Sequence, residues 1–400
     1  MTVMTDLAPA ETFADQSGWS LPAWTYTDAD FMALEKAKLF MPAWHLVCHV
    51  ADLPRPGDYQ TFAMMGERAL VVRGKDGAIR AFHNVCPHRA ARLVDGDANG
   101  DGHGNCGGRI TCPYHAWSFA LDGKLLAVPF IEEYENFAKA DFGLFPLEHG
   151  INNGFVYVRF GEGTQALDEY LAPIAEEMDL YRFGAMEPLV PIRSRVREVN
   201  WKNACDNYVD ALHIRVAHPG LNSLVRDTYR LTVDRGVDKI FAEAGTGKSA
   251  HASVTAYRDV LPRVDHLPED RQQMWTYYRL FPGLMFDVYP DQIDFMQFIP
   301  LTPTTCLLRD GAYALPDSRR EMKAARYLNG RINRDVNLED KSLIERVQDG
   351  MGTSRFKQGP LGKNEICLRS FAQRMRREIP ISAQVQHPGR EQLQAELNAA

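Results

Sequence analysis

Two short loops that each pair one cysteine with one histidine constrain this chain of 400 residues more than any other feature. The first reads Cys86-Pro87-His88 and the second reads Cys112-Pro113-Tyr114-His115. Two thiolates suit one iron of a two-iron, two-sulfur cluster, and two neutral imidazoles on the other iron raise its reduction potential. Cys86, His88, Cys112 and His115 are therefore candidate ligands of an electron-transfer cluster.

A structural zinc site of the Cys2His2 type uses the same four side chains and is the alternative. A zinc finger carries two cysteines in one loop and two histidines on a helix, whereas each loop here carries one of each. Cys106, between the loops, has no histidine at ligand spacing, and we place it outside the cluster. The seven cysteines are an odd number spread over a long chain, so disulfides are not expected. The pairing favours iron and sulfide over zinc.

Short β-rich runs with turn signals surround the two loops. They span His45 to Val50, Tyr59 to Met64, Ala69 to Val72, Ile79 to His83 and Phe155 to Phe160. Asp76-Gly77 and Asp122-Gly123 supply the positive φ that tight two-residue hairpins require. The sequence predicts a small antiparallel β domain over residues 43–160.

The rest of the chain mixes helical and strand patterns. Helices are expected over Leu167 to Met178, Asn200 to His213, Glu339 to Gly350 and Ile366 to Glu378, and strands over Leu284 to Val288 and Ile293 to Ile299. We therefore predict an α+β domain over residues 161–400. In residues 1–42 a helix from Asp28 to Phe40, capped by Asp28 or Asp30, is expected to pack on this larger domain. Ser382 to Ala400 is polar and predicts a surface helix or a loose tail.

A second candidate site lies in the run from Asp206 to His213, which is followed by His218-Pro219. The spacing of His213 and His218 exceeds one helical turn, so Pro219 and the chain near Ala217 are expected to end the helix and present the second imidazole. Iron(II) oxygenases bind metal through two histidines and one carboxylate, which leaves open positions for dioxygen and substrate. The third ligand must then be an aspartate or a glutamate.

Both sites resemble motifs of one family. Cys86 to Arg89 and Cys112 to Trp117 resemble the Rieske motif of ring-hydroxylating oxygenase α subunits, and Asn200 to Pro219 resembles their mononuclear iron motif. The resemblance implies an N-terminal antiparallel β Rieske domain and a C-terminal α+β, helix-grip-like catalytic domain with a central antiparallel sheet. It also implies a [2Fe-2S] cluster and a mononuclear Fe(II).

Several positions near the cluster motif differ from the family pattern. The extra cysteine that respiratory Rieske proteins carry in each loop is absent after His88, which implies a lower-potential, oxygenase-type cluster. Ala90 and Ala116 replace glycines that are common in the family, and their methyl groups are expected to be tolerated if the local φ is negative. The stretch from Asp95 to Gly102 is longer than usual in the family and is predicted to be a surface loop.

The resemblance also assigns the third iron ligand. Its best match is Asp340, just ahead of the run from Leu343 to Gln348, with Glu339 and Asp335 as fallbacks. An N-cap for the following helix is the alternative role of Asp340.

Two further residues near the histidines are candidates for catalytic roles. Asp210 lies three residues before His213 and can orient its imidazole. The resemblance implies that Asp210 also bridges to a cluster histidine of a neighbouring subunit, which would be His115. Asn207 matches a family position close to the iron.

The implied activity is that of a terminal oxygenase component. It would use dioxygen and electrons from a separate reductase or ferredoxin, since the chain carries no flavin or nicotinamide motif, to hydroxylate an aromatic, acidic small molecule in aromatic hydrocarbon catabolism. The alternative is oxidative N- or O-demethylation of a methylated amine, a quaternary ammonium or a methoxy compound. Phe281 to Pro290 and Ile293 to Pro300 resemble the sheet that lines the family's substrate pocket, with the protein core as the alternative place for them. Their aromatic side chains could hold such a cation by cation–π contact. Monooxygenation and dioxygenation both stay open.

The assembly and the compartment follow from the resemblance and from composition. A homotrimer is implied, with a small β subunit as an option. A formal charge of -7 provides no basic field for nucleic acid or anionic lipid. No run approaches the roughly 18 apolar residues of a spanning helix, and residues 1–15 are acidic and lack an export pattern. We predict a cytoplasmic protein. Two rival interpretations are a pure electron carrier and a zinc-stabilised binding protein.

Overall fold

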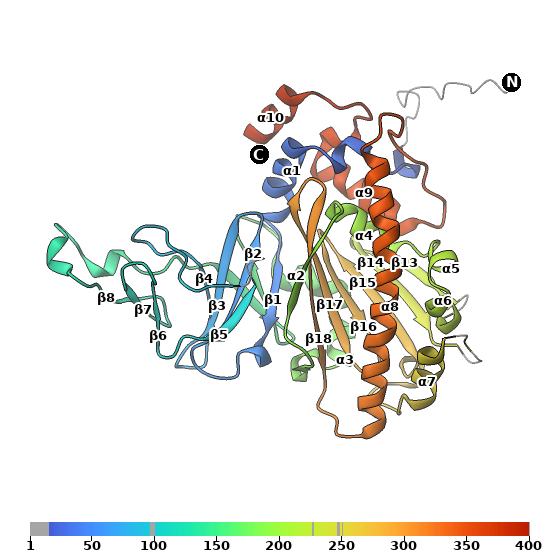
Figure 1. The fold of residues 1–400 in the computed structure, drawn as a ribbon, viewed down its shortest axis with the longest axis horizontal. Helices are drawn as coiled ribbons and strands as arrows, with labels where there is room; N and C mark the ends of the chain where they lie inside the picture. The colour runs from blue at the N-terminus through green and yellow to red at the C-terminus, as the bar shows by residue number, and fades with distance from the viewer. Residues whose placement is uncertain (1–15, 97–100, 226–227, 246–248, 250, 400) are drawn as a thin grey trace.

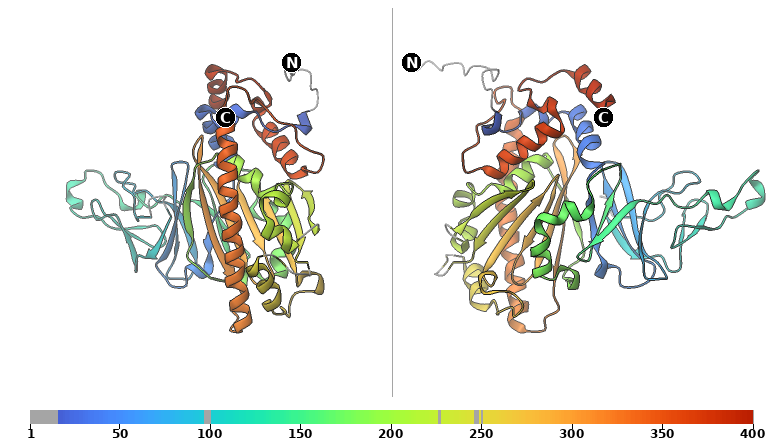
Figure 2. Two further views of the ribbon diagram at one scale, coloured as in Figure 1. Left: turned by 45° about the vertical axis from the view of Figure 1, so that its right-hand side comes forward. Right: turned by 180° about the vertical axis from the view of Figure 1, so that it is seen from behind.

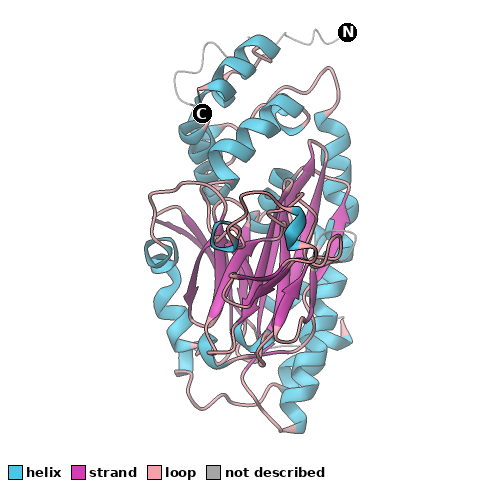
Figure 3. Ribbon diagram, turned by 90° about the vertical axis from the view of Figure 1, so that its left-hand side faces the viewer, coloured by secondary structure: helices cyan, strands magenta, loops and turns pink. Residues whose placement is uncertain are grey.

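The computed structural model describes residues 16–96, 101–225, 228–245, 249 and 251–399, so the acidic segment 1–15 lies outside the described residues. A small β region stands at one end of the molecule, and a large sheet flanked by helices forms the rest (Figure 1). Figure 3, viewed from the end that carries the small β region, shows strands at the centre and helices around them. The predicted α+β class is confirmed.

The small β region contains three antiparallel sheets. Its strands are β1 (His45–His49), β2 (Asp58–Met64), β3 (Glu67–Arg73), β4 (Ile79–His83), β5 (Gly102–Asn105), β6 (Arg109–Thr111), β7 (Ser118–Ala120), β8 (Leu125–Ala127), β9 (Glu148–Asn152) and β10 (Phe155–Arg159). The sheets have the orders β4-β3-β2-β5, β6-β7-β8 and β1-β10-β9. Gly77 and Gly123 have φ of 81° and 88°, and both hairpins are present. Their loops have three residues rather than the two predicted, because the amides of Gly74 and Ala120 donate to the carbonyls of Ala78 and Lys124. The first Cys/His loop follows β4, and the second joins β6 to β7.

The large sheet has eight antiparallel strands. They are β11 (Glu187–Pro188), β12 (Arg193–Arg197), β13 (Arg230–Asp234), β14 (Val237–Glu243), β15 (Met274–Leu280), β16 (Leu284–Val288), β17 (Ile293–Thr302) and β18 (Thr305–Ala314). The order is β11-β18-β17-β16-β15-β14-β13, with β12 also paired to β18. Both predicted strands are present, and the second extends to Thr302.

The helices of the described chain are α1 (Ala29–Glu35), α2 (Leu167–Leu171), α3 (Ala175–Leu180), α4 (Trp201–Val209), α5 (Ile214–Ala217), α6 (Pro219–Val225), α7 (Ala252–Val260), α8 (Arg320–Met351), α9 (Ile366–Glu378) and α10 (Arg390–Asn398). Shorter 3-10 turns span Gln16–Gly18, Ala23–Tyr26, Val50–Asp52, Ile131–Glu133, Lys139–Asp141, Ala172–Ile174, Phe183–Ala185, Glu269–Arg271 and Pro380–Ala383. None of the helices in the described ranges is both long and apolar enough to cross a bilayer.

The long helix α8 runs along one face of the large sheet (Figures 1 and 2). The helix predicted from Glu339 is only its C-terminal part. The helix predicted from Leu167 to Met178 is instead broken into α2 and α3, because Pro173 lacks an amide proton and interrupts the hydrogen bonding between them.

The two chain ends pack together on the large domain. Asp28 caps α1 by accepting a hydrogen bond from the amide of Phe31 at 2.7 Å, and a π-helical turn over Lys36–Phe40 continues it. The polar C-terminal segment forms the helix α10, with Leu393 buried, and this helix contacts α1. The alternative of a surface helix, rather than a loose tail, is therefore the one observed.

A buried arginine joins the small β region to the large sheet. Arg309 of β18 is fully buried, and its Nε lies 2.7 Å from Oδ1 of Asp101, just before β5. Its Nη1 donates to the carbonyl of Leu46 in β1 at 3.0 Å and to Oε1 of Gln297 at 2.8 Å. The prediction of a surface loop up to Gly102 is wrong at Asp101, since this carboxylate is needed to pair the buried guanidinium; residues 97–100 of that loop lie outside the described chain.

Candidate metal centres and substrate cavity

The chain between α4 and α6 presents two histidines. The helix predicted to reach His213 ends at Val209, because Asp210 adopts an extended conformation with φ -81° and ψ 107°. The short helix α5 follows His213 and ends at Ala217, and His218 is non-helical before Pro219 opens α6. The expected break before Pro219 is thus observed.

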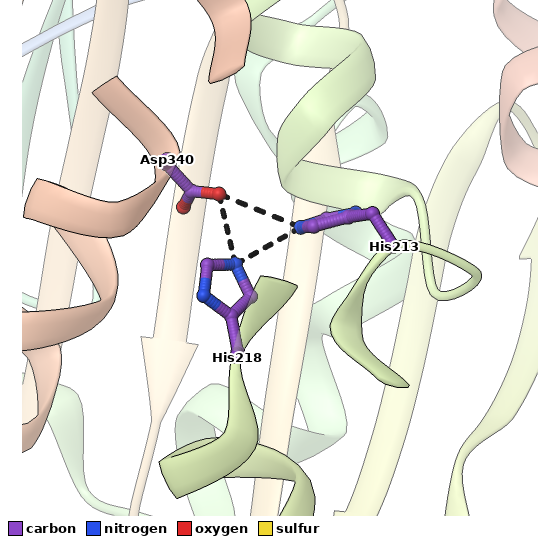
Figure 4. A group of neighbouring side chains, drawn as sticks. All are labelled: His213, His218 and Asp340. Carbon is purple, nitrogen blue, oxygen red and sulfur yellow. Dashed lines mark hydrogen bonds and ion pairs between the residues drawn. The ribbon is translucent and has the colours of Figure 1, made fainter. Parts of the chain in front are cut away.

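These histidines meet a carboxylate from α8 (Figure 4). Nε2 of His213 lies 3.1 Å from Nε2 of His218, and Oδ1 of Asp340 lies 2.8 Å and 3.5 Å from the Nε2 atoms of His218 and His213. Such an arrangement fits the two-histidine, one-carboxylate iron site. Asp340 lies well inside α8, which begins at Arg320, so the alternative that Asp340 is a helix N-cap is wrong.

Each imidazole has a second carboxylate on its far nitrogen. Oδ2 of Asp210 lies 3.2 Å from Nδ1 of His213, and Oε2 of Glu339 lies 2.7 Å from Nδ1 of His218. Glu339 forms a hydrogen bond with its imidazole, which fixes the ring orientation and leaves the lone pair of Nε2 for a metal, whereas Asp210 is within ion-pair distance of His213 without hydrogen-bond geometry. Asp210 is thus next to His213 as predicted, although it has left the helix.

The electrostatics of the group suit a cation. Burial by itself lowers the pKa of His213, but Asp210 and Asp340 together raise it to about 9. Burial by itself raises the pKa of Asp340, but hydrogen bonds from the two histidines and from Asn207 outweigh burial and hold that pKa well below its usual range. The carboxyl group is therefore ionised at neutral pH. Asn207 contacts the candidate ligand Asp340, as expected of a residue close to the iron.

The cluster loops bring both thiols and both imidazoles together in pairs. Cys86 and Cys112 are 2% and 3% exposed and interact with each other, and burial raises the pKa of Cys86 to about 11. The rings of His88 and His115 lie 4.7 Å apart. Tyr134 contacts Nε2 of His88 at 3.4 Å, whereas Nδ1 of His115 is buried and has no hydrogen-bond partner among the described residues. Buried thiols are unfavourable as free thiolates, but a bound metal ion displaces the proton and stabilises the thiolate. These thiols and the imidazole nitrogen without a partner therefore fit metal ligands.

The four residues do not surround a single point. In the described parts of the chain, His213, His218 and Asp340 are the one set of three or more His, Cys, Asp or Glu residues whose ligand atoms all lie within 4.8 Å of one another. Ligands of one tetrahedral zinc ion stand roughly 3–4 Å apart. The pairs therefore fit the two ends of a two-iron cluster better than zinc. The thiol of Cys106 donates a hydrogen bond to the carbonyl of Gly57 at 3.3 Å, in keeping with its predicted place outside the cluster.

The condition under which the methyl groups of Ala90 and Ala116 were expected to be tolerated, a negative φ, is not met. Their φ angles are 55° and 58°, in the left-handed region. Each amide donates to the carbonyl of the cysteine four residues earlier, Cys86 at 3.0 Å and Cys112 at 3.1 Å. Both loops need this conformation to turn the chain back, and an alanine there costs roughly 1 kcal/mol.

A cavity reaches the three candidate iron ligands and Asn207. On its wall, Tyr277 of β15 pairs directly with Asp287 of β16. The hydroxyl of Tyr208 donates to Oδ1 of Asp287 at 2.5 Å, and that of Tyr289 donates to Oδ2 at 3.2 Å. Burial leaves Asp287 7% exposed and raises its pKa to about 6.

The tyrosine rings stand nearly perpendicular to one another. Tyr208 and Tyr277 have centroids 6.3 Å apart and planes at 80°, and Tyr277 and Tyr289 have centroids 6.2 Å apart and planes at 87°. We call these three residues the tyrosine cage. The predicted pocket segment contributes Asp287 and Tyr289, whereas Tyr208 and Tyr277 were missed because they lie on other elements.

Comparisons with known proteins agree with both centres. The chain matches the Rieske [2Fe-2S] domain over residues 43–138 and the catalytic domain of ring hydroxylating alpha subunits over residues 178–380. It is 30% identical over 346 residues to the carnitine monooxygenase oxygenase subunit of Acinetobacter baumannii, covering 85% of this chain and 87% of that protein. It is 28% identical to the chloroplastic choline monooxygenase of Amaranthus tricolor, covering 86% and 74% of the two chains.

A solved structure is similar over nearly the whole molecule. It is a quaternary ammonium Rieske monooxygenase described in terms of carnitine oxidation by gut microbiota and inter-subunit electron transfer. The TM-score is 0.76 with 26% sequence identity, and the match covers 95% of this chain and 100% of the other.

Proposed function

The chain belongs to the Rieske ring-hydroxylating oxygenase α subunits, and from this premise we propose that it oxidises a methylated ammonium compound. Members of this family are oxidoreductases that hold a [2Fe-2S] cluster and a mononuclear iron and take electrons from a separate donor. The related enzymes named above act on carnitine and choline, both quaternary ammonium compounds. Of the two activities predicted from the sequence, they favour the alternative over hydroxylation of an aromatic acid.

The tyrosine cage around Asp287 is the observation that carries this proposal. A quaternary ammonium group has a diffuse positive charge and no hydrogen-bond donors, so it is bound best by aromatic faces. A buried carboxylate adds to that attraction. An uncharged aromatic substrate would gain nothing from Asp287, whose burial is unfavourable without a cationic partner.

We assign the ligands residue by residue. Cys86, His88, Cys112 and His115 would hold the cluster, and His213, His218 and Asp340 would hold the mononuclear iron. The iron, when bound, supplies the activation of dioxygen. Asp210 and Glu339 hold the imidazoles in orientation, and Asn207 holds the carboxylate.

The reaction we propose is a monooxygenation. One oxygen atom enters a C–H bond of a carbon attached to nitrogen, and the other leaves as water after uptake of two electrons and two protons. The hydroxylated carbon then separates from the nitrogen as a carbonyl group, which releases an amine. The tyrosine cage would fix the nitrogen so that this carbon stays near the iron ligands.

We further propose that the working unit is a homotrimer in which the cluster of one subunit lies beside Asp210 of the next. In Figure 1 the loops around β6–β8 and the helix α5 stand at opposite ends of the molecule, and electron tunnelling weakens steeply with distance. Apolar side chains are exposed near both centres: Tyr114 at 56%, Leu212 at 50% and Val216 at 88%. Such groups suit a protein contact.

The domain division we propose is 1–42, 43–160 and 161–400.

Oxygen uptake coupled to product tests the function. The iron- and sulfide-loaded protein, supplied with a surrogate reductase, is given carnitine, choline, glycine betaine, benzoate and a methoxybenzoate. We expect at least one methylated ammonium compound to yield a carbonyl product and an amine in proportion to the dioxygen consumed. Coupled product from the aromatic acids alone would overturn the proposal.

A further inference from the structure

A second cavity adjoins the substrate cavity between the large sheet and α8. The two share lining residues, namely Arg197, Asp287, Met296, Asn333 and Asn337. The outer cavity is also lined by side chains that are largely exposed, Tyr327 at 69% and Leu338 at 63%. The shared residues therefore stand where a passage from the surface meets the chamber with the iron ligands.

The outer cavity is rich in arginine. Its lining includes Arg193, Arg195, Arg197, Arg326 and Arg334, against the three aspartates Asp287, Asp294 and Asp310. Nη2 of Arg195 lies 2.6 Å from Oδ1 of Asp310, so these two charges neutralise each other. Arg326 donates to the carbonyls of Asp291 and Leu315. A positive balance remains at this entrance.

Arg197 is distinct among these arginines because it lines both cavities. It is half-buried at the end of β12, and within the described chain its guanidinium makes no hydrogen bond and no ion pair. A partly buried charge without an acceptor is unfavourable. A guanidinium binds a carboxylate through two parallel hydrogen bonds, so an incoming carboxylate would satisfy it.

The inner wall has the opposite character. The tyrosine cage and Asp287 form an anionic, aromatic pole, whereas Arg197, together with Lys341 on the same lining, forms a cationic pole. Lys341 is already 3.8 Å from Glu345 of its own helix, so Arg197 is the cation left without a partner. A chamber with two opposite poles suits a ligand that carries both charges.

We propose that the substrate is a zwitterion, with its ammonium group in the tyrosine cage and its carboxylate on Arg197. The inference rests on the proposed function and narrows it: a methylated ammonium compound with a carboxylate arm is preferred to one whose arm is uncharged. Arg197 is then the residue that determines this specificity.

Matched pairs of compounds test the role of Arg197. Carnitine is compared with its amide, and glycine betaine with its amide, because each pair differs only in the negative charge. We expect kcat/KM to be roughly tenfold or more higher for the acid than for the amide, as for a charge-assisted hydrogen bond. Arg197→Gln should remove this preference by lowering the value for the acids, and Arg197→Lys should restore part of it.

Arg263→Gln is the control, since Arg263 is a surface residue paired with Glu269 and lines neither cavity. Equal activity on acids and amides in the unaltered protein would overturn the inference, as would an equal loss on both in Arg197→Gln. If Arg197→Gln does not fold, as judged from the cluster spectrum, the comparison in the unaltered protein still decides. Failure of the proposed function looks different, because no methylated ammonium compound, acid or amide, would then be oxidised.

Discussion

Oε2 of Glu339 lies 2.7 Å from Nδ1 of His218, on the side of the imidazole opposite Asp340, whose Oδ1 lies 2.8 Å from Nε2. Glu339 and Asp340 are neighbours in α8, yet they contact different nitrogens of one ring. The direction in which each side chain leaves the helix therefore decides which carboxylate would face the iron. Position in the sequence alone does not, since the two residues are adjacent.

This geometry predicts different results for the two carboxylates. Asp340→Asn should abolish binding of the mononuclear iron and reduce oxygenation to background, because it removes a charged ligand. Glu339→Gln keeps a hydrogen-bond acceptor for His218 and should lower iron affinity or activity by roughly tenfold to 100-fold. Iron content and coupled turnover measure both effects. Asp335→Asn is the control and should match the parent protein; iron loss in that variant alone would contradict the assignment.

Exchange of Asp210 tests the electron path between subunits. Asp210→Ala, assayed with enough iron to keep both centres occupied, should slow the oxidation of the reduced cluster in a single turnover by roughly tenfold or more. Stopped-flow absorbance of the cluster measures the rate. Asp179→Ala, at an exposed position of α3, is the control. Cluster oxidation at the parental rate in Asp210→Ala would show that this residue is not the bridge.

The left-handed alanines predict a gain in stability from glycine. Ala90→Gly and Ala116→Gly should each stabilise the Rieske domain by about 0.5 kcal/mol, since relief of strain exceeds the added entropy of the unfolded chain. The midpoint of thermal loss of the cluster absorbance should rise by roughly 1–2 °C. Ala91→Gly, at a residue without positive φ, should lower it instead. A lower midpoint in both of the first two variants would contradict the argument.

The tyrosine cage predicts that the aromatic face matters more than the hydroxyl group. Tyr277→Phe keeps the ring and should retain binding of a trimethylammonium compound within about threefold, whereas Tyr277→Leu should weaken it by roughly tenfold, the size of an exposed to partly buried cation–π contact. Dissociation constants of the loaded enzyme give the comparison. Equal affinity in both variants would mean that the cation binds elsewhere.

Asp287 makes this binding dependent on pH. Burial raises its pKa to about 6, against hydrogen bonds from Tyr208 and Tyr289 that lower it. The carboxylate is charged above that pH and neutral below it, so affinity for choline, whose own charge does not change, should fall as the pH drops through 6. The facing Tyr277 has a pKa raised above 10 by burial and stays neutral in this range, and burial and the neighbouring Asp287 raise the pKa of Asp294 well above its usual range. Asp287→Asn should bind weakly and without this pH dependence; an unchanged profile in that variant would place the titration in another group.

Local signals in the sequence were enough for several elements of the fold. The strand Ile79–His83, the strand Leu284–Val288 and the helix Ile366–Glu378 have the bounds that were predicted. A run with one clear periodicity and turn residues at its ends carries its own boundaries. The N-terminal half of α8 was missed because Gly330 and a polar run obscure its helical pattern.

The candidate site divides in the same way. The Cys/His loops and the pair His213 and His218 are short-range patterns, whereas Asp340 was identified only through the family resemblance. The contact of Tyr277 with Asp287 depends on the register of β15 and β16, which tertiary packing sets. The conformation of Ala90 could not be deduced either, since the course of the loop decides it.

Arg309 bears on how the protein works as a machine. A carrier that swings between donor and acceptor has to open its hinge at every turnover. Separating the small β region from the large sheet would break the ion pair between Arg309 and Asp101 and leave buried charges unpaired, which costs several kcal/mol. The domain that holds the cluster is therefore fixed relative to the large sheet. In the proposed trimer the distance that an electron crosses is then determined when the subunits assemble, and the rate of electron transfer should not depend on solvent viscosity, as it would for a domain that diffuses.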